Sequence, residues 1–328
     1  MILSAQLHGK TIAITGASGY IGSAIADALA KHSSPVLRIS RAGLAPRAGM
    51  KAMRADVRTG ECWAEIVKQA DVIVHLAGNT SVSVAAKHPV DSLHATLLPV
   101  LHLVKAAGEL GRRPRVVFSS TATVYGLTDK LPVAETLEPK PITVYDLHKL
   151  FAEQQLALAT QQGIIESVSL RLANVYGPSS AISSAADRGI LNRITAMALQ
   201  GKDLSIYGDG NYLRDYVYID DVASAFLFAA ITPGLGGRAF NIGSGTGTSL
   251  KQAFHTVADR VAAVTGQRPK TVSRPWPADA DPIESRNFVA STACFRAATD
   301  WRAEVDLGKG LELLIADYRL GADCKRAD

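Results

Sequence analysis

The stretch from Thr11 to Gly22 reads Thr-Ile-Ala-Ile-Thr-Gly-Ala-Ser-Gly-Tyr-Ile-Gly and decides the fold. Its first five residues are apolar or β-branched, which predicts a buried strand over residues 11–15. A helical spacing of apolar residues begins near Tyr20, so three glycines lie on a turn between a strand and a helix. We expect the first glycine to permit a tight turn and the third to let the helix pack closely on the strand.

The turn at residues 16–22 has the features of an anion-binding loop. Glycine lets the backbone approach a phosphate, and the first turn of a helix presents unpaired N–H groups with partial positive charge. The strand before it and the helix after it favour this interpretation over a loop that is rich in glycine for turn reasons alone. The predicted contacts with a dinucleotide pyrophosphate are Gly16, Ser18, Gly19, Tyr20, Ile21 and Gly22.

The second predicted strand, residues 36–40, ends at Ser40 and is followed by Arg41. NAD sites usually have an acidic residue at this strand end, which binds the adenosine ribose. A carboxylate would repel a 2′-phosphate, whereas a guanidinium binds one well. We therefore predict an NAD(P) cofactor with NADP(H) favoured over NAD(H), with Arg41 as the main contact and Arg38 or Arg47 as helpers. The alternative for Arg41 is a solvated loop charge.

The third and fourth strand regions carry further cofactor candidates. Asp56 and Val57 close the region of residues 51–57, and an Asp there can bond the adenine amino group. Residues 71–78 form another buried strand, in which we expect His75 to be a packed, hydrogen-bonded side chain rather than a catalyst. Small residues at the carboxyl end of a strand leave room for a cofactor. The candidates at this end are Leu76, Ala77 and Gly78.

Tyr145 and Lys149 are four residues apart in a run with helical spacing, so their side chains share one helix face. A tyrosine phenol has a pKa of about 10 and is a poor base at neutral pH. A nearby ammonium and an oxidised nicotinamide both favour the phenolate, which can take a proton from a sugar hydroxyl while hydride leaves its carbon. The strand predicted over 115–121 ends in hydroxyls. Of these, Ser119 is expected at the cofactor and Ser120 or Thr121 at the substrate oxygen.

Further motifs follow the glycine turn in a fixed order. They read H-L-A-G at 75–78, S-S-T-A-T-V-Y-G at 119–126, Y-D-L-H-K at 145–149, R-L-A-N-V-Y-G-P at 171–178, I-Y-G-D-G-N-Y-L-R-D-Y-V-Y-I-D-D-V at 206–222 and F-N-I-G-S-G at 240–245. With these motifs the chain resembles an extended short-chain dehydrogenase/reductase of the nucleotide-sugar epimerase/dehydratase family, from Lys10 to about Ile315. The set is specific for the family and much less specific for one substrate.

The resemblance implies roles for individual residues. Thr121, Tyr145 and Lys149 match the catalytic set, and Lys149 would also bind the nicotinamide ribose. Asn174 matches a residue near the sugar and diphosphate, Tyr207 one that stacks on the base, and Arg214 one that binds the phosphates, with Arg286 as a second arginine. A guanidinium fork suits a diphosphate; the alternative for Arg214 is a surface salt bridge with Asp209 or Asp215. The predicted substrate contacts are Ser120, Thr121, Asn174, Tyr207, Arg214 and Arg286.

Ala122 and Thr123 exclude two activities of the resembled family. Dehydratase relatives carry an Asp-Glu pair directly after the catalytic Thr, and decarboxylase relatives carry a Glu; this chain has neither. The segment is most like that of UDP-galactose 4-epimerases. We therefore predict an NAD(P)-dependent nucleotide-sugar 4-epimerase. The alternatives are an NADPH-dependent reductase of a nucleotide-linked 4-keto-deoxysugar and a non-catalytic NADP(H) sensor.

Predicted strands and helices alternate as far as Leu172, which indicates an α/β fold with a Rossmann-type doubly wound parallel sheet. We expect residues 1–172 to form this NAD(P)-binding domain. Residues 173–328 should form mainly a smaller C-terminal substrate-binding lobe, with some segments returning to the first domain. Within it we expect substrate loops over 178–187 and 275–282, a helix over 188–200 and a frayed tail over 321–328.

Composition limits the partners. The net charge is +5 over 328 residues, with no block of like charge, which argues against nucleic-acid binding and suits an anionic nucleotide sugar. Three cysteines without C-x-x-C spacing, Cys62, Cys294 and Cys324, indicate a reduced cytoplasm and no metal site. With no apolar run of transmembrane length and no signal peptide, we expect a cytoplasmic protein that does not enter membranes.

Apolar stripes mark the helical runs after Asp91 and around Tyr145. In the resembled family such helices form a two-fold four-helix interface, so we expect a homodimer. Packing of the same stripes on the sheet is the alternative, and both can hold together.

Overall fold

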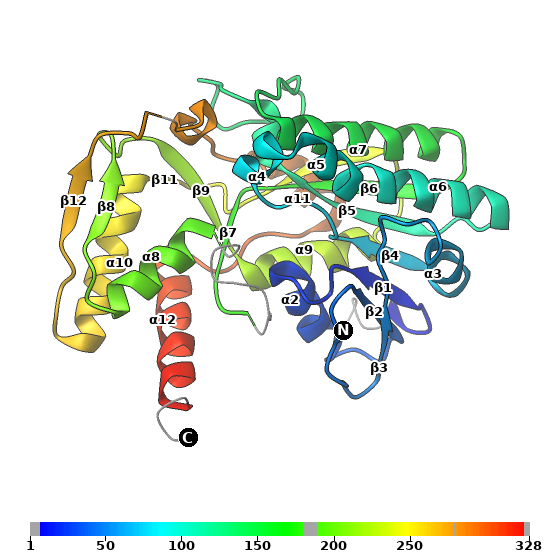
Figure 1. Ribbon diagram of the computed structural model, residues 1–328, viewed down its shortest axis with the longest axis horizontal. Helices are drawn as coiled ribbons and strands as arrows, with labels where there is room; N and C mark the ends of the chain where they lie inside the picture. Colours follow the sequence, from blue (N-terminus) through cyan, green and yellow to red (C-terminus); the bar gives the residue numbers. More distant parts are fainter. Residues whose placement is uncertain (1–6, 180–188, 279, 325–328) are drawn as a thin grey trace.

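The computed structural model describes residues 7–179, 189–278 and 280–324, the last four of these by their backbone only. Within these residues seven parallel strands form one sheet in the order β10-β6-β5-β4-β1-β2-β3 (Figure 1). They are β1 (Ile12–Thr15), β2 (Val36–Ser40), β3 (Met50–Arg54), β4 (Val72–His75), β5 (Arg115–Thr121), β6 (Glu166–Leu172) and β10 (Arg238–Ile242). The chain builds β2 and β3 on one side of β1 and then crosses to β4 on the other. The carboxyl ends of β1 and β4 therefore border the crevice in which such sheets bind ligands.

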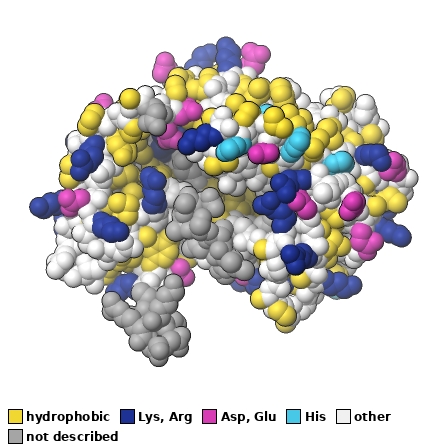
Figure 2. All heavy atoms as spheres, in the orientation of Figure 1, with side chains coloured by type: hydrophobic (Ala, Val, Ile, Leu, Met, Phe, Trp, Pro, Cys, Tyr) yellow, Lys and Arg dark blue, Asp and Glu magenta, His cyan; other side chains and the backbone are white. Residues whose placement is uncertain are grey.

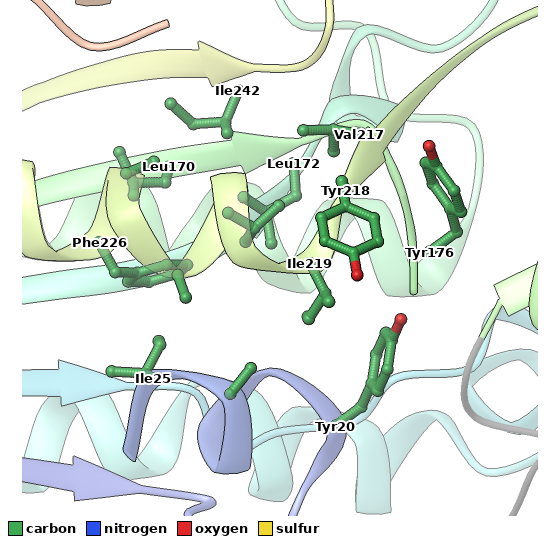
Figure 3. Close-up of a cluster of buried hydrophobic side chains, with 14 of the residues drawn as sticks. Tyr20, Ile25, Leu170, Leu172, Tyr176, Val217, Tyr218, Ile219, Phe226 and Ile242 are labelled. Atoms are coloured by element: carbon green, nitrogen blue, oxygen red, sulfur yellow. The ribbon is translucent and has the colours of Figure 1, made fainter. Parts of the chain in front are cut away.

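Helices cover both faces of this sheet (Figure 1). One face carries α2 (Tyr20–Leu29) and α9 (Ile219–Ile231), and the other carries α3 (Trp63–Gln69), α6 (Leu98–Leu110) and α7 (Val144–Gln161). Side chains alternate along β1, because Ile12 and Ile14 pack in the first layer and Ala13 in the second. Figure 3 shows the first layer, with Ile25 of α2 facing Phe226 of α9. The predicted α/β class with a doubly wound sheet is confirmed.

Segments after Leu172 form smaller sheets and the helices around them, in the left half of Figure 1. β7 (Asn174–Tyr176), β9 (Leu213–Tyr218) and β11 (Gly247–Ser249) form one sheet, and β8 (Leu204–Tyr207) pairs with β12 (Thr271–Arg274). The helices are α8 (Gly189–Leu199), α10 (Leu250–Thr265) and α12 (Leu307–Cys324). β10 is a strand of the large sheet and α9 packs on that sheet, although both follow Leu172. The two parts are therefore interleaved in sequence. The division at residue 172 stays a prediction.

Shorter elements complete the chain. They are α4 (Val82–Lys87), α5 (Pro89–Thr96), α11 (Ala293–Thr299) and the single turns η1 (Ala122–Tyr125) and η3 (Pro282–Ser285). Over the ranges that the structure describes, no helix combines the length and the apolar character that crossing a membrane requires.

Some predicted limits differ from the structure. β3 pairs with β2 as far as Ser40 and Arg54 and ends where its partner ends. Asp56 and Val57 therefore follow the strand instead of closing it. The tail expected to fray from Gly321 continues α12 to Cys324. Residues 325–328, residues 180–187 of the first predicted substrate loop, Asp279 of the second and Arg188 of the predicted helix lie outside the described residues.

Candidate active site

The glycine turn lies directly against the end of β4. Gly16 has a φ of +69°, and a Cβ built there would lie 3.0 Å from the backbone nitrogen of Ala77. A Cβ on Gly22 would overlap the carbonyl oxygen of Gly16. Neither position can hold a side chain without displacing backbone, so the glycines are required for α2 to start beside the crevice.

The start of α2 is open to an anion. Its N-cap, Gly19, provides no side-chain hydrogen bond, and the first turn carries no acidic residue. The first N–H groups of a helix have no partner within the helix and attract negative charge. The Tyr20 hydroxyl donates to the carbonyl oxygen of Gly177 at 2.8 Å, so this side chain ties the turn to β7's end and leaves only its backbone for a ligand. The turn fits a dinucleotide pyrophosphate.

The end of β2 presents hydroxyls and an arginine. Ser40 Oγ lies 2.8 Å from Ser18 Oγ, which joins this strand end to the glycine turn. Arg41 is exposed beside it. Of the two predicted helpers, Arg38 is buried and donates to the carbonyl oxygen of Ala45 at 2.7 Å, and Arg47 forms an ion pair with Asp27 at 2.5 Å. Arg41 is therefore the cation best placed to meet a phosphate here.

Asp56 and Val57 have separate structural roles. The Asp56 carboxylate pairs with Arg58 at 2.5 Å, and hydrogen bonds from Arg58 lower its pKa to about 2. Val57 is buried against the layer that contains α3 and α6.

One pocket of about 340 Å³ joins the glycine turn to the ends of β4, β5 and β6. The predicted site residues that line it are Gly16, Gly19, Tyr20, Ile21, Gly22, Leu76, Ser119, Ser120, Thr121, Tyr145, Lys149 and Asn174. Residues that line it without having been predicted are Asn79, Thr80, Leu172, Ala173, Val175, Gly189, Ile190, Leu191 and Tyr216. The remaining predicted residues lie outside this lining. They are Ser18, Ser40, Arg41, Asp56, Val57, Ala77, Gly78, Tyr207, Arg214 and Arg286.

Thr121, Tyr145 and Lys149 share one wall of the pocket. Lys149 Nζ donates to the carbonyl oxygen of Ser119 at 2.8 Å and lies 5.9 Å from the centre of the Tyr145 ring. Burial lowers the pKa of Lys149 to about 8, so the ammonium persists at neutral pH. Burial and the neighbouring Asp146 carboxylate raise the pKa of Tyr145, while a hydrogen bond with Thr121 lowers it. Without further positive charge in the pocket, Tyr145 therefore carries its proton.

A buried ion pair lies beneath this wall. Glu153, one helical turn after Lys149, accepts from Arg171 Nη2 at 2.7 Å and also accepts the hydroxyl proton of Ser120. Arg171 in turn donates to the Tyr125 hydroxyl at 2.9 Å. Ser120 therefore points below the pocket floor, which leaves Thr121 as the hydroxyl beside Tyr145.

His75 is the packed histidine that the sequence suggests. It is fully buried, its Nδ1 lies 2.8 Å from Thr15 Oγ1, and its ring stacks on Phe118. Burial lowers its pKa to about 3, so the imidazole is neutral at all ordinary pH values.

The predicted phosphate and base contacts are already engaged with protein. Arg214 is buried and donates to the carbonyl oxygens of Glu284 and Arg286. Arg286 Nη2 lies 3.5 Å from Asn174 Oδ1. The carboxylates considered as salt-bridge partners of Arg214 accept elsewhere, Asp215 from Ser244 and Asp209 from Asn211.

Tyr207 stacks on Trp276, with ring centres 5.5 Å apart, and stays 37% exposed. This pair offers a flat aromatic surface at the edge of the smaller lobe.

Tyr216 is a pocket residue that sequence reasoning missed. Its side chain is 3% exposed and its hydroxyl lacks a hydrogen-bond partner among the described residues. Burial raises the pKa of Tyr216 to about 12, against the nearby charges of Arg214 and Arg286. It lies in the motif at residues 206–222, so only its position in space distinguishes it from the other residues of that motif.

In the described part of the chain no group of His, Cys, Asp and Glu has a geometry that could hold a metal.

A doubly wound sheet whose glycine turn faces a Tyr and a Lys across one pocket defines an enzyme that uses a nicotinamide dinucleotide. A sequence model of the NAD dependent epimerase/dehydratase family matches residues 12–243, and the chain belongs to this family. The predicted family and the predicted enzyme class, an NAD(P)-dependent epimerase or reductase, are confirmed.

The chain is similar to characterised members along nearly all of its length. It is 29% identical to UDP-glucose 4-epimerase of Azospirillum brasilense, covering 92% of this chain and 89% of the relative. It is also 29% identical to GDP-6-deoxy-D-mannose reductase of Pseudomonas aeruginosa, covering 93% and 96%. The crystal structure of UDP-glucose 4-epimerase from Thermotoga maritima with UDP-glucose has a TM-score of 0.84 at 27% identity, covering 95% and 99%.

The contact between Gly22 and Gly16 predicts that Gly22→Ala weakens dinucleotide binding. The added methyl group overlaps the Gly16 carbonyl oxygen, and relieving such overpacking costs about 1–3 kcal/mol. We expect a loss of about tenfold to a hundredfold in affinity for NADH and NADPH, measured by calorimetry on protein whose circular dichroism is unchanged. Gly108→Ala is the control, since a Cβ there meets its nearest atom at 3.8 Å. Equal affinity in Gly22→Ala and wild type would contradict the turn's role.

Proposed function

We propose that the protein is a nucleotide-sugar 4-epimerase. The observation that carries the proposal is the composition of the pocket wall: Thr121, Tyr145 and Lys149 lie together, and no described residue that lines the pocket is Asp or Glu. A dehydratase needs a carboxylate at the sugar to remove water across neighbouring carbons. Proton transfer at a single carbinol oxygen needs only the hydroxyl and ammonium groups present.

Each side chain has a defined task in this reaction. Tyr145 removes the proton from the C4 hydroxyl and later returns it, which is general base and then general acid catalysis. The Lys149 ammonium lies close enough to stabilise the phenolate. Thr121 holds the substrate oxygen beside Tyr145. The nicotinamide, when bound, takes hydride from the sugar carbon and gives it back.

The substrate is proposed from the site and the relatives together. Two of the three relatives described above are named as UDP-glucose 4-epimerases, so UDP-glucose is the first candidate. Tyr207 and Trp276 offer an aromatic surface for a base. Tyr216 and Arg286 lie near Asn174, where a sugar diphosphate would cross from one lobe to the other.

A second candidate is reduction of a nucleotide-linked 4-keto sugar. Two observations favour it: the reductase relative at 29% identity, and the raised pKa of Tyr145, which keeps the proton that a reductase must donate. Identification of the nucleotide released from denatured protein separates the two. An epimerase must keep its hydride carrier between half-reactions, whereas a reductase exchanges it at each turnover.

We further propose that the enzyme prefers NADP(H) to NAD(H). Ser40 replaces the acidic residue that would bind a ribose 2′-hydroxyl, and Arg41 is exposed directly after it. A guanidinium forms strong charge-assisted hydrogen bonds with phosphate.

A homodimer through α6 and α7 is proposed from their exposed apolar side chains. Leu101, Leu147, Phe151 and Leu158 are each at least 37% exposed, although other residues of both helices pack on the sheet. Figure 2 shows hydrophobic side chains gathered over α4, α5 and α7 at the top of the molecule. Burying such a face against a second copy removes it from water.

Tyr145→Phe should retain dinucleotide affinity and lose activity. Removing the phenol removes the proton acceptor, which typically costs about 10²- to 10⁴-fold in rate. The measurement is conversion of UDP-galactose to UDP-glucose, with calorimetry for cofactor binding. Tyr318→Phe, on α12 and outside the pocket lining, is the matched control and should keep wild-type activity. A fully active Tyr145→Phe enzyme would end the acid–base assignment.

Arg41→Asp should reverse the cofactor preference. Loss of a hydrogen bond to a charged group costs about 1.5–3 kcal/mol, so affinity for NADPH should fall by about tenfold to a hundredfold while affinity for NADH holds or rises. The ratio of the two dissociation constants is the readout. Arg113→Asp, an exposed loop arginine before β5, makes the same charge change elsewhere. An unchanged ratio would make Arg41 a solvated loop charge.

Phe151→Glu should give a monomer if α7 faces a second copy, because a buried glutamate would be left without a partner. Light scattering coupled to size exclusion reports the mass. Leu320→Glu on α12, at a position 68% exposed, is the control and should leave the mass unchanged. A wild-type monomer, or a dimeric Phe151→Glu variant, would refute this interface.

A further inference from the structure

Asp146 is a buried acid beside the catalytic tyrosine. It follows Tyr145 on α7, and its side chain is fully buried although it does not line the pocket. One role is local: Thr143, the N-cap of α7, donates from its hydroxyl to Asp146 Oδ2 at 2.7 Å and accepts the Asp146 N–H at 3.1 Å. That exchange caps the helix and uses one carboxylate oxygen.

The other carboxylate oxygen leads to the reacting groups. Asp146 Oδ1 accepts the hydroxyl proton of Thr123. Thr123 Oγ1 lies 2.8 Å from Thr121 Oγ1, and Thr121 and Tyr145 line the same pocket. A row of hydrogen-bonded hydroxyls therefore leads from the Asp146 carboxylate to Thr121, which shares the pocket wall with the Tyr145 phenol.

The charge of Asp146 sets the direction of this chain. An ionised carboxylate can only accept hydrogen bonds, so the Thr123 hydroxyl donates its hydrogen bond to Asp146. Toward Thr121 the Thr123 oxygen can then only accept. Thr121 then points its own proton at Thr123 and keeps a lone pair for another donor. Both hydrogen bonds run from Thr121 toward Asp146, which is the polarity that a proton moving from the pocket to Asp146 requires.

We propose that Tyr145 and Asp146 share one proton through Thr121 and Thr123, so that Asp146 is the internal proton acceptor that lets Tyr145 become a phenolate without contact with solvent. The O–H bond of Tyr145 breaks, each threonine passes on its proton and receives its neighbour's, and an O–H bond forms on Asp146. Net charge is unchanged and no electrons move. Thr121 then donates its one proton to the phenolate.

Several groups act on the Asp146 carboxyl. Burial raises the pKa of Asp146, hydrogen bonds from Thr123 and Thr143 and the charge of Arg286 lower it, and Asp281 raises it. Lys149 faces Tyr145 from α7 and itself faces Glu153, which Arg171 neutralises. Because only one member of the pair is negative at a time, two adjacent anions are avoided.

This role rests on the proposed function, and pH profiles test it. Enzyme loaded with NADP⁺, the cofactor proposed above, is mixed rapidly with UDP-glucose, and the rate of nicotinamide reduction is followed from pH 6 to 9. In wild type the proton moves internally, so the rate should be nearly independent of pH. In Asp146→Asn the phenol must release its proton to solvent, so the rate should rise about tenfold per pH unit below the pKa of Tyr145.

Three variants separate the relay from helix capping. Thr123→Val interrupts the chain and leaves the cap, and should acquire the same slope, whereas Thr123→Ser should restore the flat profile. Thr143→Val removes the capping hydroxyl and leaves the relay, and should lose stability while its profile stays flat. A flat profile in folded Asp146→Asn or Thr123→Val overturns the proposal.

A spectroscopic readout does not depend on turnover. Infrared difference spectra of the NADP⁺ complex minus the free enzyme should contain a protonated carboxyl band that Asp146→Asn and Thr123→Val both lack. If wild type converts no UDP-sugar but shows this band, the proposed function fails and the relay stands. If the band is absent from wild type, the relay is wrong whatever the activity.

Discussion

The contact between the Gly16 turn and the end of β4 is the constraint on which the site depends. β1 and β4 pair in parallel with Thr15 opposite His75. The Thr15 hydroxyl meets the His75 ring at 2.8 Å and accepts the N–H groups of Leu76 and Ala77 at 3.2 Å. Both walls of the crevice are therefore fixed to each other by buried hydrogen bonds, and the bare backbone at residue 16 sets how closely they approach. The start of α2 takes its position from this junction.

Buried charge is balanced in small groups around the pocket. Glu153 and Arg171 form an ion pair whose side chains are both less than a tenth exposed, and Glu153 also supports Lys149. A lone ammonium at that depth would lose its proton, so the pair helps to keep the charge that the phenolate needs. Asp146 differs from Glu153, because hydroxyl groups and no guanidinium donate to its carboxylate oxygens. In the proposed relay this carboxylate accepts the proton that Tyr145 releases.

Local features of the sequence predict local parts of the structure. The strand at Thr11–Thr15 and the helix from Tyr20 are visible from residue spacing because their patterns lie within one segment. The end of β3 is not, because β2 supplies its partners and stops at Ser40. Likewise Arg38 looks free to meet a phosphate in sequence, but the fold buries it against Ala45. Tyr216 gives no local signal, since its role comes from the pocket wall to which β9 carries it.

By itself the sequence determined the doubly wound fold and the family, because both depend on residue types at fixed spacings and in a fixed order. It also predicted Thr121, Tyr145 and Lys149 as the catalytic set. Only the tertiary structure decided which hydroxyl faces the pocket and which faces Glu153 below it. It also decided that Asp146, within the motif at residues 145–149, reaches Thr121 through Thr123. Those contacts join α7 to the end of β5 across more than twenty residues of chain. The physical reason is that hydrogen-bond direction and burial depend on neighbours in space, which residue spacing along one segment does not record.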